Sequence, residues 1–278
     1  MKLYKTNTGI IAAHNETYYL LPQNDWDDII NQPDLYNWLQ SKMGSLQPID
    51  NAADLLQNDL LVPIGTQEVW AAGVTYLRSK EARMEESQQS GGATFYDKVY
   101  DAERPEIFFK ANAHKVVAHN GKVRIRKDSN WNVPEPELTL VVNSEGEIVG
   151  YTIGNDMSSR SIEGENPLYL PQAKMYDGSA AIGPCVLITQ EPIDPSTLIS
   201  IIILRNGVNL FEGNVTINKM KRQHTELVEF LYREYSFSTG VYLMTGTCVV
   251  PDNDFTLQSG DEVQITIAGI GQLINTVA

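Results

Sequence analysis

Two glutamates one residue apart, Glu135 and Glu137, are the side chains best placed to do chemistry in this sequence. On a β-strand, alternate residues point to the same face, so the two carboxylates would lie side by side. Like charges at that separation repel one another unless a cation lies between them. The pair therefore indicates a cation site, although an isolated Glu-x-Glu is more often a solvated strand face.

A third carboxylate joins the pair if the next segment forms a hairpin. Residues 138–143 and 148–154 are typical of two strands joined by a tight turn. A two-residue turn at Glu145-Gly146 would place Asp156 opposite Glu135 on the same face, whereas a turn one residue longer would break that pairing. Oxygen ligands without a nearby His or Cys suit Mg²⁺ or Mn²⁺, with Ca²⁺ as another candidate.

The composition restricts the partners of such a site. The 278 residues carry 35 acidic and 21 basic side chains, a formal net charge of −14. This charge repels phosphate backbones and anionic membranes, so it argues against nucleic acid and membrane partners. A small anionic substrate would need local positive charge from Arg, Lys or a metal ion. Because the first residues are polar, the apolar runs are short and only two cysteines occur, we expect a cytoplasmic protein.

The length favours one large domain with a small accessory domain. Residues 1–67 are predicted to form a small N-terminal α+β domain, with short strands within 3–13 and 18–21 and a helix over 26–43. This small domain would precede the segment that carries the three carboxylates.

The rest of the chain, residues 68–278, is predicted to form a β-rich α+β domain. Its short apolar runs are separated by Gly, Pro, Asn and Asp, a pattern that favours a barrel or sandwich over a βαβ wind. One helix is expected within 215–232. The polar stretch 80–101 is either a solvated helix followed by a flexible turn or a mobile lid over a site.

The residues around the three carboxylates resemble the fumarylacetoacetate hydrolase superfamily. The resemblance covers about residues 68 to 278 and implies a mixed β-sandwich roll, a Mg²⁺-type site and a homo-oligomer, either a dimer or a tetramer. The motifs that carry it are the Glu-x-Glu pair, Gly154-Asn155-Asp156-Met157-Ser158-Ser159-Arg160, Lys174, Gly183-Pro184, Thr245-Gly246-Thr247, 257–261 and 269–275.

The resemblance also implies roles for particular residues. It makes Glu135, Glu137 and Asp156 the metal ligands. It makes Lys174 a catalytic lysine, and it makes Thr247 a substrate contact.

A second set of motifs is similar to one branch of this superfamily, the 2-keto-3-deoxy sugar-acid dehydratases, with a substrate such as 2-keto-3-deoxyarabinonate. These motifs occupy 73–79, 82–87, 95–97, 102–106 and 108–111. The hydrolase branch typically follows an Asn-Tyr pair with a His and a Glu that activate water, whereas Ser79 and Ala82 stand at those places here. The departure favours dehydration over hydrolysis.

An enolate mechanism is the resulting hypothesis. A 2-oxo acid can chelate a metal through its carboxylate and its 2-oxo oxygen, and the metal stabilises the enolate formed when a C3 proton leaves. Lys174 is the candidate base, with a pKa that a nearby cation would lower. Glu106 is the candidate acid for the departing C4 hydroxyl, and a salt-bridged structural role is an equal alternative.

Basic and hydroxyl side chains could bind the substrate's carboxylate or its hydroxyls. The candidates are Arg78, Ser79 and Arg83. Arg160, four residues after Asp156, is instead a candidate to pair with an acidic metal ligand.

Two other functions stay open at the level of the sequence. The same metal site could serve a hydrolase or decarboxylase that acts on an acylpyruvate or a related diketo acid, with its base supplied from elsewhere. A non-catalytic protein with a structural Ca²⁺ ion is the alternative from another class, although it would not need Lys174 and Thr247.

Overall fold

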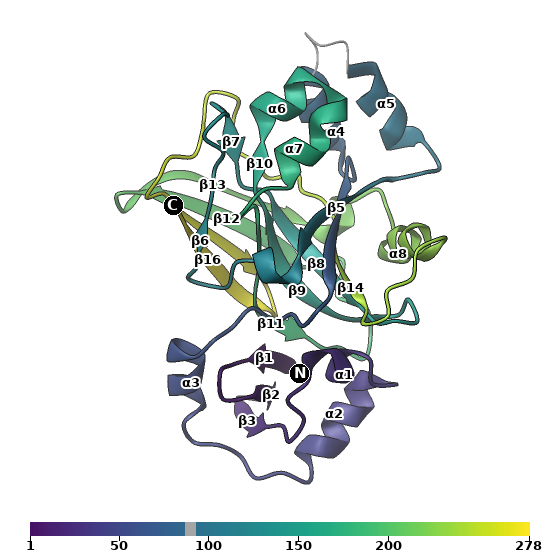
Figure 1. Ribbon diagram of the computed structural model, residues 1–278, viewed down its shortest axis with the longest axis vertical. Helices are drawn as coiled ribbons and strands as arrows, with labels where there is room; N and C mark the ends of the chain where they lie inside the picture. Colours follow the sequence, from purple (N-terminus) through teal and green to yellow (C-terminus); the bar gives the residue numbers. More distant parts are fainter. Residues whose placement is uncertain (87–92) are drawn as a thin grey trace.

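The computed structural model describes residues 1–86 and 93–278, and in these ranges nine strands form one mixed sheet, called here the large sheet (Figure 1). Neighbouring strands are antiparallel except β14 and β4, which run parallel. In spatial order the strands are β3 (Thr17–Leu20), β2 (Ile10–His14), β1 (Lys2–Lys5), β11 (Ala180–Leu187), β9 (Ile148–Asp156), β8 (Pro136–Val142), β14 (Val241–Met244), β4 (Glu68–Gly73) and β5 (Glu106–Asn112).

A second sheet, the small sheet, packs against one face of the large one. Alternate residues of β15 (Glu262–Ile267), namely Val263, Ile265 and Ile267, are buried, which is the period of a strand with one core face. The other strands of the small sheet are β13 (Val208–Thr216), β12 (Leu198–Arg205), β16 (Gly271–Val277) and β6 (Lys122–Val123). A separate pair consists of β7 (Asn132–Val133) and β10 (Ser158–Ser159).

Strand β8 contributes to two separate cores because its successive side chains point to opposite faces. Leu138 and Leu140 belong to the core between the two sheets. Val141 belongs to the second core, which the N-terminal helices cover. This strand-rich α+β sandwich confirms the fold class expected from the sequence.

The N-terminal segment differs in detail from the expectation. The single helix expected over 26–43 is wrong, because the chain forms α1 (Trp26–Ile30) and α2 (Leu35–Met43). Pro33 disfavours helical backbone at the residue before it, and the Asp34 side chain accepts a hydrogen bond from the Asn37 amide to start α2. The strand expected within 3–13 is two strands, β1 and β2, and α3 (Ala52–Asn58) was not expected.

Four helices lie at the end of the molecule opposite α1, α2 and α3 (Figure 1). They are α4 (Leu77–Glu86), α5 (Ala93–Asp101), α6 (Arg160–Glu165) and α7 (Leu170–Lys174). Residues 87–92, part of the stretch interpreted as a lid or a solvated turn, lie outside the described residues, so the lid stays a prediction.

The remaining helices are short. The helix expected within 215–232 is α8 (His224–Tyr232), and the 3-10 turns are η1 (Ala113–Lys115), η2 (Pro167–Tyr169) and η3 (Ile217–Lys219). In the described part of the chain, no helix combines the length and the apolar character needed to cross a membrane.

The N-terminal segment is joined to the large sheet in two ways. Strand β1 pairs with β11, so the sheet continues into residues 2–20. A buried chain of hydrogen bonds also runs from the Trp26 indole to the Tyr242 hydroxyl at 3.1 Å and from that hydroxyl to the Pro63 carbonyl at 2.5 Å. The division into 1–67 and 68–278 stays a prediction.

We expect Tyr242→Phe to lower the free energy of unfolding by roughly 1–3 kcal/mol, because it leaves the Trp26 indole and the Pro63 carbonyl buried without their partner. Denaturant unfolding followed by fluorescence would measure the change. Tyr235→Phe, at an exposed tyrosine, is the control and should change little. An equal loss in both variants would contradict the role of this hydrogen-bond chain.

Candidate metal centre

The β8–β9 hairpin sets the positions of the three acidic residues. Glu137 pairs with Gly154, and the amides of Glu135 and Asp156 each donate to the other's carbonyl, at 3.2 and 3.0 Å. Glu135 and Asp156 are therefore opposite one another, which confirms the predicted register.

The turn that produces this register is not the predicted one. The Gly146 amide donates to the Asn143 carbonyl at 3.1 Å, and Gly146 has a φ of 81°, so the turn has three residues and ends on a left-handed glycine. The ladder then shifts by one residue between Val141 and Val142, which leaves Val149 as the extra residue of a bulge. The bulge cancels the longer turn and restores the pairing at the acidic end.

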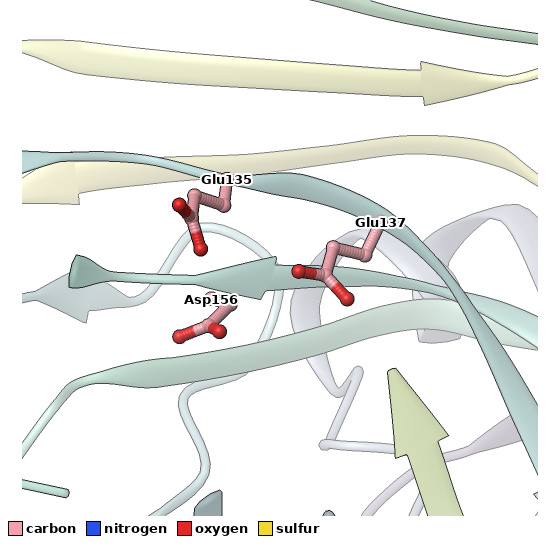
Figure 2. A group of neighbouring side chains, drawn as sticks. All are labelled: Glu135, Glu137 and Asp156. Carbon is pink, nitrogen blue, oxygen red and sulfur yellow. The ribbon is translucent and has the colours of Figure 1, made fainter. Parts of the chain in front are cut away.

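The three carboxylates form a compact buried cluster. Glu135, Glu137 and Asp156 are 3%, 2% and 1% exposed, and each offers an oxygen that lies within 4.8 Å of the others. Figure 2 shows Glu135 and Glu137 leaving the same stretch of chain towards one side, with Asp156 on the neighbouring strand. Such close burial of three acids requires positive charge around them.

Two of the carboxylates are each held by basic side chains. Arg160 Nη2 donates to Glu135 Oε1 at 2.6 Å, which confirms that Arg160 pairs with an acidic residue of the cluster. Lys110 Nζ lies 2.5 Å from Asp156 Oδ1. The Lys174 ammonium donates to Glu135 Oε2 and, at 3.0 Å, to Asp156 Oδ2, so it lies between them.

The third carboxylate is held by the main chain. Glu137 Oε2 accepts a hydrogen bond from the Gly246 amide at 2.5 Å. Gly246 has a φ of 93°, and a Cβ atom there would lie 2.1 Å from Thr75 Oγ1. A glycine is therefore needed at this position for the loop to approach Glu137.

The charges in the cluster shift one another's protonation. Burial raises the pKa of Glu135 and raises the pKa of Glu137 well above its usual value, and in each case neighbouring carboxylates add to the effect. Burial acts in the same direction on Asp156, but Lys110 and Lys174 outweigh it and its pKa is lowered. Burial alone would lower the pKa of Lys174, yet Asp156 and Glu135 raise it.

This donor set fits a hard divalent cation. All the grouped ligand atoms are carboxylate oxygens, the donors that Mg²⁺, Mn²⁺ and Ca²⁺ take in proteins. Burial and the neighbouring carboxylates raise the pKa of Glu135 and Glu137, and a bound cation would favour their charged forms. The ammonium of Lys174 lies between two of the carboxylates.

Glu106, the predicted acid, lies at the start of β5 and packs against Gly73. A Cβ atom on Gly73 would lie 1.8 Å from Glu106 Oε2, so a larger residue there would displace this carboxyl group. The Oε2 atom is buried and has no hydrogen-bond partner among the described residues. Burial raises the pKa of Glu106, which Arg83 partly offsets.

The predicted substrate-binding residues have different surroundings. Arg83 is buried and forms an ion pair with Glu163 of α6, whereas Arg78 is half-exposed and lies 3.8 Å from Glu81. The Ser79 hydroxyl bonds to the backbone of Tyr76. Their contacts with substrate stay predictions.

Thr247 lies in the loop after β14 and is buried, next to the glycine that holds Glu137. Its hydroxyl accepts a weak hydrogen bond from the Val249 amide at 3.4 Å. Its predicted contact with substrate also stays a prediction.

Three groups of this cluster were not identified from the sequence. The Ser158 hydroxyl bonds to both Glu135 and Lys174, Glu163 pairs with Arg83, and Lys110 contacts Asp156. Lys110 carried one local signal, because it is a charged residue in the apolar run Phe108-Phe109-Lys110-Ala111.

A cavity of about 1060 Å³ lies elsewhere, against α8, the β8–β9 turn and residues 189–195. None of the three carboxylates lines it. The buried charges converge at the carboxylate cluster and not at this cavity.

Comparisons with known proteins agree with this geometry. The fumarylacetoacetate hydrolase C-terminal family matches residues 69–278. A probable 2-keto-3-deoxyxylonate dehydratase of Haloferax volcanii is 49% identical over 217 residues, which cover 78% of this chain and 74% of that protein. The 2-dehydro-3-deoxy-D-arabinonate dehydratase of Saccharolobus solfataricus is 46% identical over 224 residues, which cover 79% of this chain and 75% of that protein.

Solved structures show the same fold. A 2-keto-3-deoxy-D-arabinonate dehydratase complexed with magnesium and 2,5-dioxopentanoate has a TM-score of 0.83 and 37% identity, covering 100% of this chain and 98% of that one. A fumarylacetoacetate hydrolase from Exiguobacterium antarcticum, 20% identical, has a TM-score of 0.71 and covers 100% of this chain and 99% of that one. The family match, the curated relatives and the fold agree, and the chain belongs to the fumarylacetoacetate hydrolase family.

Proposed function

We propose that this chain is a metal-dependent dehydratase that removes water from a 2-keto-3-deoxy sugar acid such as 2-keto-3-deoxyarabinonate. The observation that carries the proposal is the buried cluster of Glu135, Glu137 and Asp156 with Lys174 between two of its members. It occurs in a chain 46% and 49% identical to two sugar-acid dehydratases. The 2,5-dioxopentanoate in the related structure is a five-carbon 2-keto-3-deoxy acid less one water.

The cation of the site is proposed to be Mg²⁺, with Mn²⁺ or Ca²⁺ as alternatives, and Glu135, Glu137 and Asp156 are its proposed ligands. A divalent cation bound there would supply a Lewis acid for the 2-oxo oxygen and would lower the pKa of Lys174. The ion in the related dehydratase structure is magnesium. The donor set of three carboxylates suits the same ion.

Lys174 and Glu106 are proposed to move the protons. Lys174 Nζ is the basic nitrogen that contacts two of the proposed ligands, so it is placed to take a proton from C3 of a substrate held there. Glu106 has a raised pKa, which keeps a proton available for the hydroxyl that leaves C4. The C4 hydroxyl would leave as water with the proton of Glu106, while Lys174 holds the C3 proton and a C3–C4 double bond forms. Transfer of a hydrogen from C5 to C3 and ketonisation of the resulting enol would then give a 2,5-dioxo acid.

Substrate binding is proposed to involve Arg78, Ser79, Arg83 and Thr247. Arg83 is buried, and its positive charge acts on the proposed acid by lowering the pKa of Glu106. Its ion pair with Glu163 holds its guanidinium in place. A fixed positive charge beside the cluster would offset the acidic field for an anionic substrate.

Hydrolysis of an acylpyruvate finds less support in the site. Ser79 stands where the hydrolase branch typically has the water-activating His, and its hydroxyl bonds to the backbone of Tyr76. The four histidines lie on β2, on η1, in the segment before β6 and on α8. A water nucleophile would therefore need another base.

We also propose self-association, as a homodimer or homotetramer. Several large apolar side chains are exposed, among them Leu168 at 84% and Val208 at 61%. Exposed apolar surface of this kind is often covered by another copy of the chain. Size-exclusion chromatography with light scattering should give two or four times 31.0 kDa, and a monomer at micromolar concentration would contradict the proposal.

We expect the purified protein with Mg²⁺ to dehydrate 2-keto-3-deoxyarabinonate. Glu137→Gln should lower the rate by more than about 100-fold, because losing a metal ligand should cost more than the roughly 10–100-fold that losing an outer-shell partner costs. Glu145→Gln, at an exposed glutamate of the turn at the other end of the hairpin, is the matched control and should keep wild-type activity. Calorimetric titration with Mn²⁺ would show whether Glu137→Gln also loses metal binding. Rapid acylpyruvate cleavage without dehydration would refute the proposed reaction.

Lys174→Met and Glu106→Gln should separate the two proton transfers. In D₂O, we expect Lys174→Met to lose both deuterium exchange at C3 and dehydration, by about 10²–10⁴-fold. Glu106→Gln should keep C3 exchange and lose only dehydration, because the hydroxyl at C4 no longer receives its proton. NMR of the substrate measures both rates, and C3 exchange that survives in Lys174→Met would exclude Lys174 as the base.

A further inference from the structure

A second buried lysine, Lys110, lies at the same cluster and has no part in the proton transfers described above. It is on β5, and its side chain is 0% exposed. Its Nζ atom lies 2.5 Å from Asp156 Oδ1, and it donates to the Met157 carbonyl at 3.0 Å and to the Lys174 carbonyl at 2.6 Å. Burying an ammonium group is costly unless its partners are well placed, so these three contacts define its position.

The partners of the two lysines differ in kind. Lys110 donates hydrogen bonds to two main-chain carbonyls and forms an ion pair with one carboxylate, that of Asp156. Lys174 directs its donors to three side chains, those of Glu135, Asp156 and Ser158. Main-chain carbonyls at the ends of β9 and α7 cannot turn away, whereas side chains can. Lys110 is therefore fixed, and Lys174 can exchange its partners.

Lys110 also connects three separate elements of the site. From β5 it contacts Asp156, the last residue of β9, the adjacent Met157, and Lys174, the last residue of α7. Helix α7 itself packs against β5. Helix α7 has only five residues, and its own hydrogen bonds provide little rigidity. A cation near the carbonyls of a helix C-terminus is favourable. Lys110 therefore stabilises the C-terminus of α7, whose last residue is Lys174.

Apart from the contacts of Lys174 and Ser158, each carboxylate of the cluster has one oxygen held by a group from outside the hairpin strands. Arg160 holds Glu135 Oε1, and the Gly246 amide holds Glu137 Oε2. Lys110 does the same for Asp156 Oδ1, which leaves Oδ2 facing Glu135 across Lys174. Without Lys110, the Asp156 carboxylate could rotate and present either oxygen.

We propose that Lys110 is a positioning residue of the metal centre, which holds Asp156 Oδ1 and the backbone of Lys174 so that Asp156 Oδ2 stays directed toward Glu135, where a cation would be held. This inference rests on the proposed function, because it requires that the carboxylate cluster binds a cation. It predicts that Lys110 controls metal affinity without being a ligand.

Replacing Lys110 with Met tests the proposal, since Met keeps most of the side-chain volume and removes the charge and the donors. We expect the Kd for Mn²⁺, measured by calorimetry on protein treated with chelator, to rise by about 10–100-fold, the usual cost of losing an outer-shell partner. Lys115→Met, at an exposed lysine that pairs with Asp177, should leave this Kd unchanged.

A general loss of stability must be distinguished from a loss of positioning. Leu39→Ala, in α2 and far from the cluster, should destabilise the protein by about 2–5 kcal/mol and leave the Kd for Mn²⁺ unchanged. If Lys110→Met binds Mn²⁺ as tightly as wild type, or if Leu39→Ala weakens binding equally, the proposal is wrong. If wild type itself binds no Mn²⁺, the proposed metal site fails as well.

If Lys110→Met does not fold, a measurement on the wild-type protein decides instead. In protein labelled with ¹⁵N at the lysine Nζ, the Lys110 ammonium signal should persist in slow exchange and keep its shift when Mg²⁺ is added. The Lys174 signal, assigned by its absence in Lys174→Met, should shift. If the chemical shift of Lys110 changes as much as that of Lys174 when Mg²⁺ is added, Lys110 is not fixed relative to Lys174 and the proposal is wrong.

Discussion

Charge pairing in a buried site is the constraint on which the rest of this structure depends. Five buried or half-buried acidic side chains lie close together at one end of the large sheet, and four buried basic side chains accompany them. The acids are Glu106, Glu135, Glu137, Asp156 and Glu163, and the bases are Lys110, Lys174, Arg83 and Arg160. Taking such groups out of water is costly unless they are paired, so each element around the cluster is held to a geometry that keeps the pairs together.

The scaffold meets this constraint with parts that are far apart in the sequence. The β8–β9 hairpin supplies three acids, α6 supplies Arg160 and Glu163, α7 supplies Lys174 and β5 supplies Lys110. Close approach of backbone completes the arrangement, because Gly73 leaves room for Glu106 and Gly246 brings an amide to Glu137. The hydrophobic cores on the two faces of β8 keep the hairpin from shifting its register.

The two buried lysines of the cluster differ in their partners: Lys110 is held by main-chain carbonyls and Lys174 by side chains. This difference suits them to different tasks in the proposed reaction. A site that only stored charge would fix all of its cations with main-chain partners, as it fixes Lys110. Lys174 instead binds side chains that a cation and a substrate would compete for, which is what a proton-transfer residue needs. The family relationship to sugar-acid dehydratases and the local geometry therefore support the same activity.

The sequence by itself determined the strand face that carries Glu135 and Glu137 and the β-rich class, because alternation along a strand is encoded by neighbouring residues. Its motifs also resembled the family that the comparisons show. The pairing of Glu135 with Asp156 was predicted from a two-residue turn, but the structure reaches it through a three-residue turn and a bulge at Val149. Only the tertiary structure decided that Lys110 and Gly246 hold two of the carboxylates, that Glu163 pairs with Arg83, and that β1 extends the large sheet. Those contacts join residues tens to more than a hundred positions apart, so they depend on how the sheets pack. No local pattern contains that information.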